Sequence, residues 1–312
     1  MRVAVTRNLL TRNPPTSNPP TSNPPTSNLF QSMNHLALYH STCSACSRLI
    51  TLRYSTSFSM GIRLFHRRFR APIYAIYGFV RFADEIVDTF HDYPKKDLLD
   101  RFREDTYRAL DEGISLNPVL HAFQQVVRQY GIGRDLIDAC LHSMEMDLYN
   151  EKYDSKLYDE YIYGSAEVVG LMCLRVFCEG KDERYEQLKA PARRLGAAFQ
   201  KINFLRDIKS DHEERGRVYF PGVDFRRFDD EAKRRIEAEI QDDFRAALEG
   251  IRRLPDGARF GVYLAYQYYL QLFAKIKSAP AHSIARKRFR VSDKRKVYLL
   301  FSSALRHRFN FL

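Results

Sequence analysis

The chain has 312 residues, of which 45% are hydrophobic and 28% are charged. This composition excludes an intrinsically disordered protein and supplies enough apolar surface for a large core. The formal net charge of +12 suits a negatively charged partner, such as a phosphorylated substrate, a nucleic acid or an anionic membrane surface. The apolar stretch from Phe260 to Ala274, which has no charged residue, is shorter than the ~20 residues of a membrane-spanning helix, so we expect no such helix.

The N-terminal segment carries three copies of Asn-Pro-Pro-Thr-Ser at residues 13–27. A proline-rich polar repeat offers nothing to bury, so we predict a disordered extension over residues 1–32 and a folded domain over residues 33–312. Met33, just before the first apolar pattern, is an alternative start. A transit peptide is the competing interpretation, because the segment has Arg, Ser and Thr but no acid. The repeated prolines argue against an amphipathic targeting helix.

The five cysteines follow no apolar signal-peptide core, which favours a reducing compartment, the cytoplasm, over a secreted disulfide framework. Cys43 and Cys46 form a C-x-x-C motif, but no second pair and no His partner with zinc-site spacing follows. We therefore expect ordinary core or helix-face cysteines.

From Leu36 onward, apolar residues recur with helical spacing, and no stretch has the sustained alternation of a strand. Asn117 is a typical helix cap, Ser155 is expected to cap another helix, and Pro191 is expected to kink or break a third. Glycines and prolines divide the chain into predicted helices over residues 71–90, 94–113, 118–131, 135–151, 155–180, 182–211, 229–254, 257–278 and 292–312. This order predicts an all-α fold, a single-domain helical bundle around a central cavity.

Two stretches place oxygen-bearing side chains at intervals of four residues. Asp84 and Asp88 form the first series. Asn203, Asp207 and Asp211 form the second. On an α-helix this spacing stacks the side chains of each series on one face.

Two helices that turn such pairs toward a shared cavity can hold Mg²⁺, which prefers oxygen ligands and bridges carboxylates to substrate phosphates. Arg81 lies one turn before Asp84, and Gln200 lies near the face of the second series. The competing interpretation is a pair of solvated acidic faces. The apolar neighbours of both series argue against it, because a carboxylate among apolar side chains is rarely buried without a partner. The spacing alone leaves both interpretations open.

Five motifs follow one another along the chain. They are Tyr-Ser-Thr-Ser-Phe at 54–58, Arg81 with Asp84-x-x-x-Asp88, Tyr161-Ile-Tyr-Gly-Ser-Ala-Glu-Val-Val-Gly170, Gln200-x-x-Asn203-x-x-Arg206-Asp207-x-x-x-Asp211 and Arg217-Val-Tyr-Phe-Pro221. In this order they resemble the squalene/phytoene synthase family, the head-to-head prenyl transferases. Within the family, the chain is most similar to the bacterial phytoene synthases, and the resemblance covers residues 45–300.

The resemblance implies an isoprenoid-synthase fold that condenses two geranylgeranyl diphosphates head to head to phytoene in carotenoid biosynthesis. Diphosphate is released, and a cyclopropyl diphosphate is the intermediate. The implied cofactor is Mg²⁺, with Mn²⁺ as an alternative, held by Asp84, Asp88, Asn203, Asp207 and Asp211. The implied substrate-binding residues are Ser57, Phe58, Arg81, Gln200, Asn203, Arg206 and Tyr219. The implied catalytic residues are Asp84, Asp88, Asp207, Asp211, Tyr161 and Tyr269.

Two positions depart from the family pattern. Glu85 stands where the first acidic motif often has Asp. On a helix this position points about 100° away from Asp84, so we expect the change to spare the metal ligands. Glu167 stands where many members have glycine, and it places an acid beside the cavity helix on a side that the sequence does not reveal.

Three alternatives remain open. A synthase acting on farnesyl diphosphate would make squalene or dehydrosqualene. Squalene needs a hydride from NADPH, which we do not expect because the chain has no glycine-rich dinucleotide motif. A non-catalytic assembly factor of the same fold would tend to lose the acidic motifs, which this chain keeps. The third alternative is a nucleic-acid-binding protein that uses the basic run at 286–290.

For a lipid substrate, a solvated or membrane-facing surface is the better interpretation of that basic run. We therefore expect prenyl diphosphates as substrates, no nucleic acid, and a cytoplasmic protein that associates peripherally with the inner membrane. The sequence gives no indication of the oligomeric state.

Overall fold

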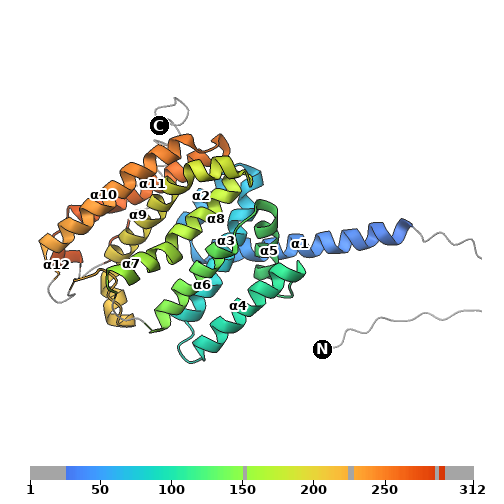
Figure 1. Ribbon diagram of the computed structural model, residues 1–312, viewed down its shortest axis with the longest axis horizontal. Helices are drawn as coiled ribbons and strands as arrows, with labels where there is room; N and C mark the ends of the chain where they lie inside the picture. Colours follow the sequence, from blue (N-terminus) through green and yellow to red (C-terminus); the bar gives the residue numbers. More distant parts are fainter. Residues whose placement is uncertain (1–25, 150–152, 224–227, 285–287, 292–312) are drawn as a thin grey trace, which may run out of the picture. The chain divides into compact units, whose positions relative to one another are not determined.

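The computed structural model contains helices and no strand in the residues that it describes, which are 26–149, 153–223, 228–284 and 288–291 (Figure 1). The predicted all-α fold is therefore confirmed. The predicted helix over residues 292–312 lies outside the described residues. Contacts divide the chain into two units, residues 1–39 and residues 40–312.

The helices are named here in chain order, with the bounds that the structure gives them. They are α1 (Thr26–Tyr54), α2 (Thr56–Arg63), α3 (Arg67–Asp88), α4 (Lys95–Glu112), α5 (Pro118–Tyr130), α6 (Arg134–Tyr149), α7 (Ser155–Ile162), the π-helical turn η1 (Tyr163–Glu167), α8 (Val168–Phe177), α9 (Asp182–Arg215), α10 (Asp230–Arg253), α11 (Asp256–Lys277) and α12 (Ala281–Ile284). Most of the predicted helices are found within a few residues of their predicted ends.

The described part of the first unit is the start of α1. Residues 26–32, which the sequence placed in the disordered extension, are helical. The last proline of the repeat is Pro25, and the helix that follows contains no proline to break it. Residues 1–25 lie outside the described ranges, so the rest of the predicted extension stays a prediction.

Local capping rules explain where several helices begin and end. The Asn117 side chain accepts hydrogen bonds from the N–H groups two and three residues later, as predicted. Gly131 ends α5 with a positive φ of 64°. Helix α7 is capped by Asp154 and not by Ser155, because the Asp154 carboxylate accepts a hydrogen bond from the Leu157 N–H at 2.8 Å.

Helix α9 continues through Pro191, where the sequence suggested a kink or a break. The proline ring faces α10, where a Cβ at Gly250 would lie 2.5 Å from the Pro191 Cβ. The two helices therefore pack closely along this stretch.

The predicted helix over residues 155–180 is interrupted by the turn η1, which packs between α6 and α9. A Cβ on Gly164 would lie 2.4 Å from the carbonyl oxygen of Ala139 in α6. A Cβ on Gly196 in α9 would lie 2.8 Å from the carbonyl oxygen of Ala166. Glycine is needed at both positions because the backbones approach too closely for a side chain. π-helical turns of this kind are frequent at functional sites.

Helix α3 has a core side and a polar side. On the core side, fully buried Phe79 stacks on Phe123 of α5 with 4.0 Å between ring centroids. On the other side, Asp84 and Asp88 keep 34% and 19% of their side-chain surface exposed. The same helix packs against α5, α6 and α8, so the core contacts fix the direction in which the two carboxylates point.

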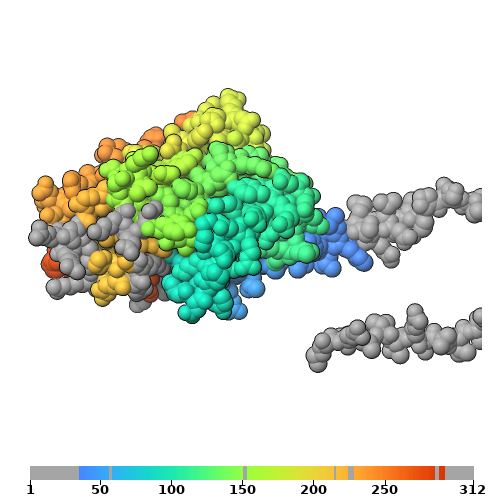
Figure 2. Space-filling view, turned by 60° about the horizontal axis from the view of Figure 1, so that its bottom comes forward, coloured from blue at the N-terminus to red at the C-terminus, as the bar shows by residue number. Residues whose placement is uncertain are grey.

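The remaining features concern the surface and the cysteines. Helix α4 lies at the surface, where it is drawn in teal in Figure 2, and its sequence is rich in charged residues. In the part of the chain that the structure describes, every helix is too short or too polar for a membrane span. None of the five cysteines forms a disulfide, and all lie in helices or at a helix end, as expected.

Replacing Gly164 tests the close packing of η1. We expect Gly164→Ala to lower the free energy of unfolding by ~1–3 kcal/mol, because the new Cβ would collide with the α6 backbone and with Ser143. Gly61→Ala in α2 is the control, since no atom lies within 4 Å of its new Cβ. That variant should be neutral or more stable by up to ~1 kcal/mol. Denaturant unfolding measures both, and equal effects would contradict the close packing.

Candidate active site

The first acidic motif lies at the C-terminal end of α3. The Arg81 guanidinium binds the carboxylates of Asp84 and Glu85 and lies over the ring of Tyr54, 4.4 Å from its centroid. Burial opposes ionisation of Glu85, but hydrogen bonds from Thr89 and Arg81 outweigh it and hold the pKa of this carboxyl below its ordinary value. The residue that departs from the family pattern therefore anchors Arg81 beside Asp84.

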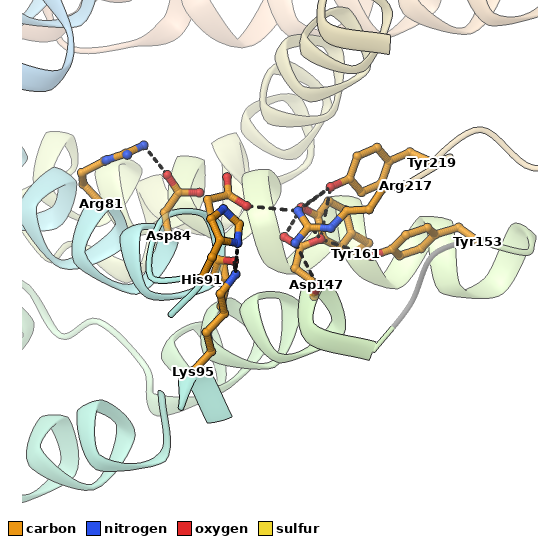
Figure 3. Close-up of polar contacts among 11 residues, drawn as sticks. Arg81, Asp84, His91, Lys95, Asp147, Tyr153, Tyr161, Arg217 and Tyr219 are labelled. Atoms are coloured by element: carbon orange, nitrogen blue, oxygen red, sulfur yellow. Dashed lines mark hydrogen bonds and ion pairs between the residues drawn. The ribbon is translucent and has the colours of Figure 1, made fainter. Parts of the chain in front are cut away.

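Asp88, the last residue of α3, contacts a residue far along the chain. Its Oδ1 atom lies 3.1 Å from Nη1 of Arg217, which follows the end of α9. Lys95 donates a hydrogen bond of 2.7 Å to the carbonyl oxygen of Val87 and lies 3.0 Å from Nδ1 of His91 (Figure 3). This lysine satisfies a carbonyl at the helix end, which has no partner within the helix. The contacts hold the end of α3, and with it Asp88, in place.

The second acidic motif lies on α9, and its first members form a chain of hydrogen bonds. Asn203 donates to Oε1 of Gln200 at 3.4 Å. The Tyr269 hydroxyl of α11 donates to Oδ1 of Asn203 at 3.2 Å, while its ring stacks on Phe199 at 3.9 Å. The structure thus brings Tyr269, the least secure of the sequence assignments, to the motif.

Asp207, in the middle of that motif, contacts two guanidiniums. Arg206 donates to it at 3.0 Å, and Nε of Arg288 lies 2.6 Å from its Oδ1 atom. Arg288 belongs to the described segment 288–291, in which Phe289 and Val291 are buried. The sequence treated the basic run around Arg288 as a surface patch. The alternation of basic and apolar residues in that run is the signal that one face is anchored in the core.

Asp211 ends the motif and is itself buried. Its backbone carbonyl accepts a hydrogen bond of 2.8 Å from the N–H of Arg217. Gly216, with a φ of 68°, makes the turn that returns the chain to this carbonyl. Because the Arg217 side chain also reaches Asp88, this turn connects the ends of the two acidic motifs.

The largest polar cluster of the site centres on Asp147 of α6, which the sequence analysis did not single out. The Tyr161 hydroxyl donates to its Oδ2 atom at 2.8 Å, and the Tyr219 hydroxyl donates to its Oδ1 atom at 3.1 Å. Arg217 lies 3.4 Å from the same Oδ1 atom and donates to the backbone carbonyl of Asp147 at 2.8 Å. Tyr153 adds a longer contact at 3.4 Å. Figure 3 shows these side chains converging on Asp147.

Burial controls the protonation of this cluster. Only 5% of the Asp147 side chain is exposed. Burial raises the pKa of Asp147 to about 6, although Arg217 and the Tyr161 hydroxyl pull it down. Burial, and then the charge of Asp147, hold the pKa of Tyr161 and that of Tyr219 well above the ordinary value of a tyrosine. At neutral pH the carboxylate is therefore mostly ionised and both phenols are protonated.

Aromatic rings surround this cluster. Tyr219 stacks on Phe204 of α9 with 4.1 Å between ring centroids and lies 4.9 Å from Tyr161. Tyr153 lies 5.2 Å from Tyr161 and 5.0 Å from Tyr219. The predicted residues Tyr161 and Tyr219 thus lie together. Their hydroxyl groups contact the Asp147 carboxylate, and their rings contact Phe204.

The early substrate motif is only partly defined. The Ser57 side chain lies outside the described residues. Phe58 is 41% exposed and packs against Tyr77 with 5.2 Å between ring centroids. Tyr77 lies one turn before Arg81 on α3, so Phe58 is near the first acidic motif.

Glu167 is the second departure from the family pattern. Its carboxylate accepts a hydrogen bond of 2.6 Å from Nε of Arg193 on α9, and that guanidinium lies over the ring of Tyr163. Burial raises the pKa of Glu167, while Arg193 opposes the rise. Glu167 therefore pairs with a neighbouring helix and has no contact with the two acidic motifs among the described residues.

The candidate ligands suit a hard divalent cation in their chemistry, because all are oxygen donors. In the described ranges, however, no three Asp, Glu, His or Cys residues form a group that could hold a metal ion. Guanidiniums contact the carboxylates instead, with Arg81 at Asp84, Arg217 at Asp88 and both Arg206 and Arg288 at Asp207. The oxygen donors therefore suit a divalent cation. For the cation to bind, these guanidiniums must either move away from the carboxylates or contact them together with the cation.

Comparison with known proteins identifies the family. The family model described as squalene/phytoene synthase matches residues 51–295. The 15-cis-phytoene synthase of Synechocystis sp. is 29% identical over 285 residues, which cover 81% of this chain and 82% of that protein. The presqualene diphosphate synthase of Rhodopseudomonas palustris is 31% identical over 170 residues, which cover 53% of this chain and 58% of that protein.

The fold is also similar to that of solved structures. A dehydrosqualene synthase in complex with a ligand superposes with a TM-score of 0.72 and 22% identity, covering 85% of this chain and 96% of that chain. At this identity the likeness concerns the fold. The family model covers most of the chain, and both acidic motifs lie within its match. The chain therefore belongs to the squalene/phytoene synthase family of prenyltransferases.

Proposed function

We propose that this protein condenses two geranylgeranyl diphosphates head to head to phytoene, with release of diphosphate, through a cyclopropyl diphosphate intermediate. The observation that carries the proposal is the set of guanidiniums at the two acidic motifs, next to a wall of tyrosine and phenylalanine rings. Guanidiniums bind phosphate oxygens in a bidentate manner, and aromatic faces stabilise cations. Relatives named phytoene synthase support the choice of product.

The charged half of the site serves the leaving group. Arg81, Arg206 and Arg288 lie where a diphosphate can accept their hydrogen bonds, and they act most strongly in a water-poor site. Mg²⁺, with Mn²⁺ as an alternative, would supply further charge neutralisation when bound, and the oxygen donors available to it are Asp84, Asp88, Asn203, Asp207 and Asp211.

The aromatic half serves the carbocation. When the first diphosphate leaves with the electron pair of its C–O bond, the C2–C3 double bond of the second substrate attacks the allylic cation. Loss of a proton then closes the cyclopropane. A second ionisation, a rearrangement and a further proton loss give the hydrocarbon. The rings of Tyr161, Tyr219 and Phe204 form the apolar wall that excludes water from such cations.

Farnesyl diphosphate is the alternative substrate, with squalene or dehydrosqualene as the product. A relative named presqualene diphosphate synthase, 31% identical over 170 residues, is the observation that favours it. We expect purified protein to form phytoene from geranylgeranyl diphosphate, unaffected by NADPH, as identified by mass spectrometry. Dehydrosqualene as the preferred product would move the assignment to the shorter substrate, and an NADPH-dependent product would identify a squalene synthase.

Replacing Asp207 tests the second acidic motif. We expect Asp207→Asn to lower kcat by ~10²-fold or more, because neutralisation of the departing diphosphate matters most in the transition state. The carboxylate lies between two guanidiniums, so its loss removes attraction and relieves no repulsion between acids. The melting temperature should therefore fall slightly, as for a partly exposed ion pair.

The matched control is Asp242→Asn on α10, where an exposed carboxylate pairs with Arg245 at 3.2 Å. It makes the same change of charge and should leave kcat unaltered. Steady-state product formation and a thermal melt, each with and without Mg²⁺, distinguish the two variants. Near-normal activity of Asp207→Asn would remove Asp207 from the site, and a large fall in melting temperature would make it a structural carboxylate.

Peripheral membrane association is part of the proposal, since the product is a hydrocarbon and the chain carries a net charge of +12. Exposed aromatic side chains near the first acidic motif, Tyr54, Phe58 and Phe82, offer apolar contacts beside Arg81. We expect binding to vesicles with anionic lipids that weakens in 1 M salt, where the Debye length is ~3 Å. Sedimentation of the vesicles measures the bound fraction. Binding that resists salt and needs detergent for release would indicate apolar insertion as the main contact.

A further inference from the structure

The buried carboxylate of Asp147 has no assigned role in prenyl transfer, yet it receives the hydroxyl groups of two tyrosines from the wall. We propose that Asp147 is a positioning residue. It holds the phenol hydrogens of Tyr161 and Tyr219, so that Tyr161 offers an electron-rich ring and an acceptor oxygen to the prenyl cation and does not act as a base. This inference rests on the proposed function and concerns how one residue of the site works.

The hydrogen-bond geometry fixes the direction of both phenols. The Tyr161 hydroxyl has one hydrogen, and its shortest contact is the 2.8 Å bond to Oδ2 of Asp147. The contact between the Tyr161 and Tyr219 oxygens is longer, at 3.4 Å. The Tyr219 hydroxyl donates to Oδ1 at 3.1 Å, while its oxygen lies 3.4 Å from Nη1 of Arg217 as an acceptor. Oδ2 thus takes the Tyr161 hydrogen, and Oδ1 takes that of Tyr219, with the Tyr153 hydroxyl in a longer contact to Oδ1 at 3.4 Å.

To act as a base without passing its own hydrogen to Asp147, Tyr161 would have to be a phenolate. That phenolate would lie 2.8 Å from an ionised carboxylate, with both groups buried and one guanidinium, Arg217, beside them. Two adjacent negative charges in a poorly solvated site are strongly unfavourable. A neutral phenol that donates to a carboxylate keeps its hydrogen and gains electron density on its oxygen and ring, which suits stabilisation of a nearby cation.

Stability alone is a poor explanation for this cluster. Burying Asp147 and Arg217 costs desolvation free energy that their attraction need not recover, and apolar replacements of buried ion pairs are often neutral or stabilising. The surroundings are apolar and aromatic: Phe204 packs against Tyr161 and Tyr219, and Tyr158 and Phe220 pack against Phe204. A buried carboxylate at Asp147 does, however, fix the direction of the Tyr161 and Tyr219 hydroxyl groups, and this explains its presence better.

The kinetic test compares full-length Asp147→Asn, Tyr161→Phe and the double variant with the wild-type protein. An amide accepts from one tyrosine and turns its own N–H groups toward the other, so the two hydroxyls lose their common direction. We expect each single variant to lower kcat by about 10- to 100-fold with KM changed less than about threefold, and the double variant to be no worse than either, because both act through one hydrogen bond. Losses that multiply, or a change confined to KM, would overturn the inference.

Tyr158→Phe is the matched control. Tyr158 lies on the same helix α7 and is buried among the same aromatic rings. In the part of the chain that the structure describes, the hydroxyl groups that contact Asp147 belong to other tyrosines, namely Tyr153, Tyr161 and Tyr219. The control variant should retain wild-type kcat and KM. An equal loss in Tyr158→Phe would mean that the cluster responds to any lost hydroxyl, and would overturn the specific role of Asp147.

The spectroscopic test uses the substrate-free protein and does not depend on activity. With tyrosine labelled by ¹³C at the ring carbon that bears the hydroxyl, the Tyr161 signal is assigned by its disappearance in Tyr161→Phe. It should keep the shift of a neutral phenol from about pH 6.5 to 9 and move in Asp147→Asn. A phenolate shift at neutral pH, or no response to Asp147→Asn, would overturn the inference.

The two tests separate the inference from the proposed function. Wild-type protein that forms no hydrocarbon from any prenyl diphosphate would refute the proposed function, whereas the labelled-tyrosine experiment would still decide the state of Tyr161. If Asp147→Asn does not fold, the wild-type titration of the assigned Tyr161 signal decides alone.

Discussion

The guanidinium of Arg217 joins three parts of the molecule that are far apart in the sequence. It contacts Asp88 at the end of α3 and Asp147 on α6, while its own backbone is bonded to Asp211 at the end of α9. A buried charge is tolerated only where it has charged or hydrogen-bonding partners on several sides. Here those partners are the residues that define the site, so the position of one acidic motif relative to the other depends on this guanidinium.

The close packing of η1 supplies the second constraint. Gly164 and Gly196 let this turn approach α6 and α9 closely, and α7, which carries Tyr161, leads directly into it. A wider separation between α6 and α7 would lengthen the 2.8 Å bond between Tyr161 and Asp147. The positions of the glycines therefore affect the proposed chemistry through the distance between two helices.

The sequence was sufficient to predict the features that depend only on residues close together along the chain. Intervals of four residues placed Asp84 with Asp88, and Asn203 with Asp207, on single helix faces, because helix geometry fixes such relations locally. The same reasoning missed Asp147 and Arg288. Their partners lie outside the reach of helix periodicity, Tyr161 at 14 residues from Asp147 and Asp207 at 81 residues from Arg288. Tertiary packing decides these pairs.

The two remaining surprises, Glu167 and Pro191, have the same origin. Glu167 lies in a π-helical turn, which rotates the residues after it relative to an ordinary helix, so an α-helical projection cannot tell which side the acid faces. Helix α9 continues through Pro191, whose ring packs against Gly250 of another helix. Reading the sequence as a regular α-helix describes neither position, because Glu167 lies in a π-helical turn and the surroundings of Pro191 include a residue of another helix.

Tyr219 stands where the charged and aromatic halves of the site meet. Its ring stacks on Phe204, while its hydroxyl contacts Asp147 and Arg217. A reaction that separates an anionic diphosphate from an allylic cation needs both environments within a few ångströms of each other, because charge separation is costly without stabilisation at each end. Since the hydroxyls of Tyr219 and Tyr161 are bound on the side of the carboxylate, their rings are left as the apolar boundary. In the proposed reaction the same two side chains would serve both environments, with their hydroxyl groups on the charged side and their rings on the apolar side.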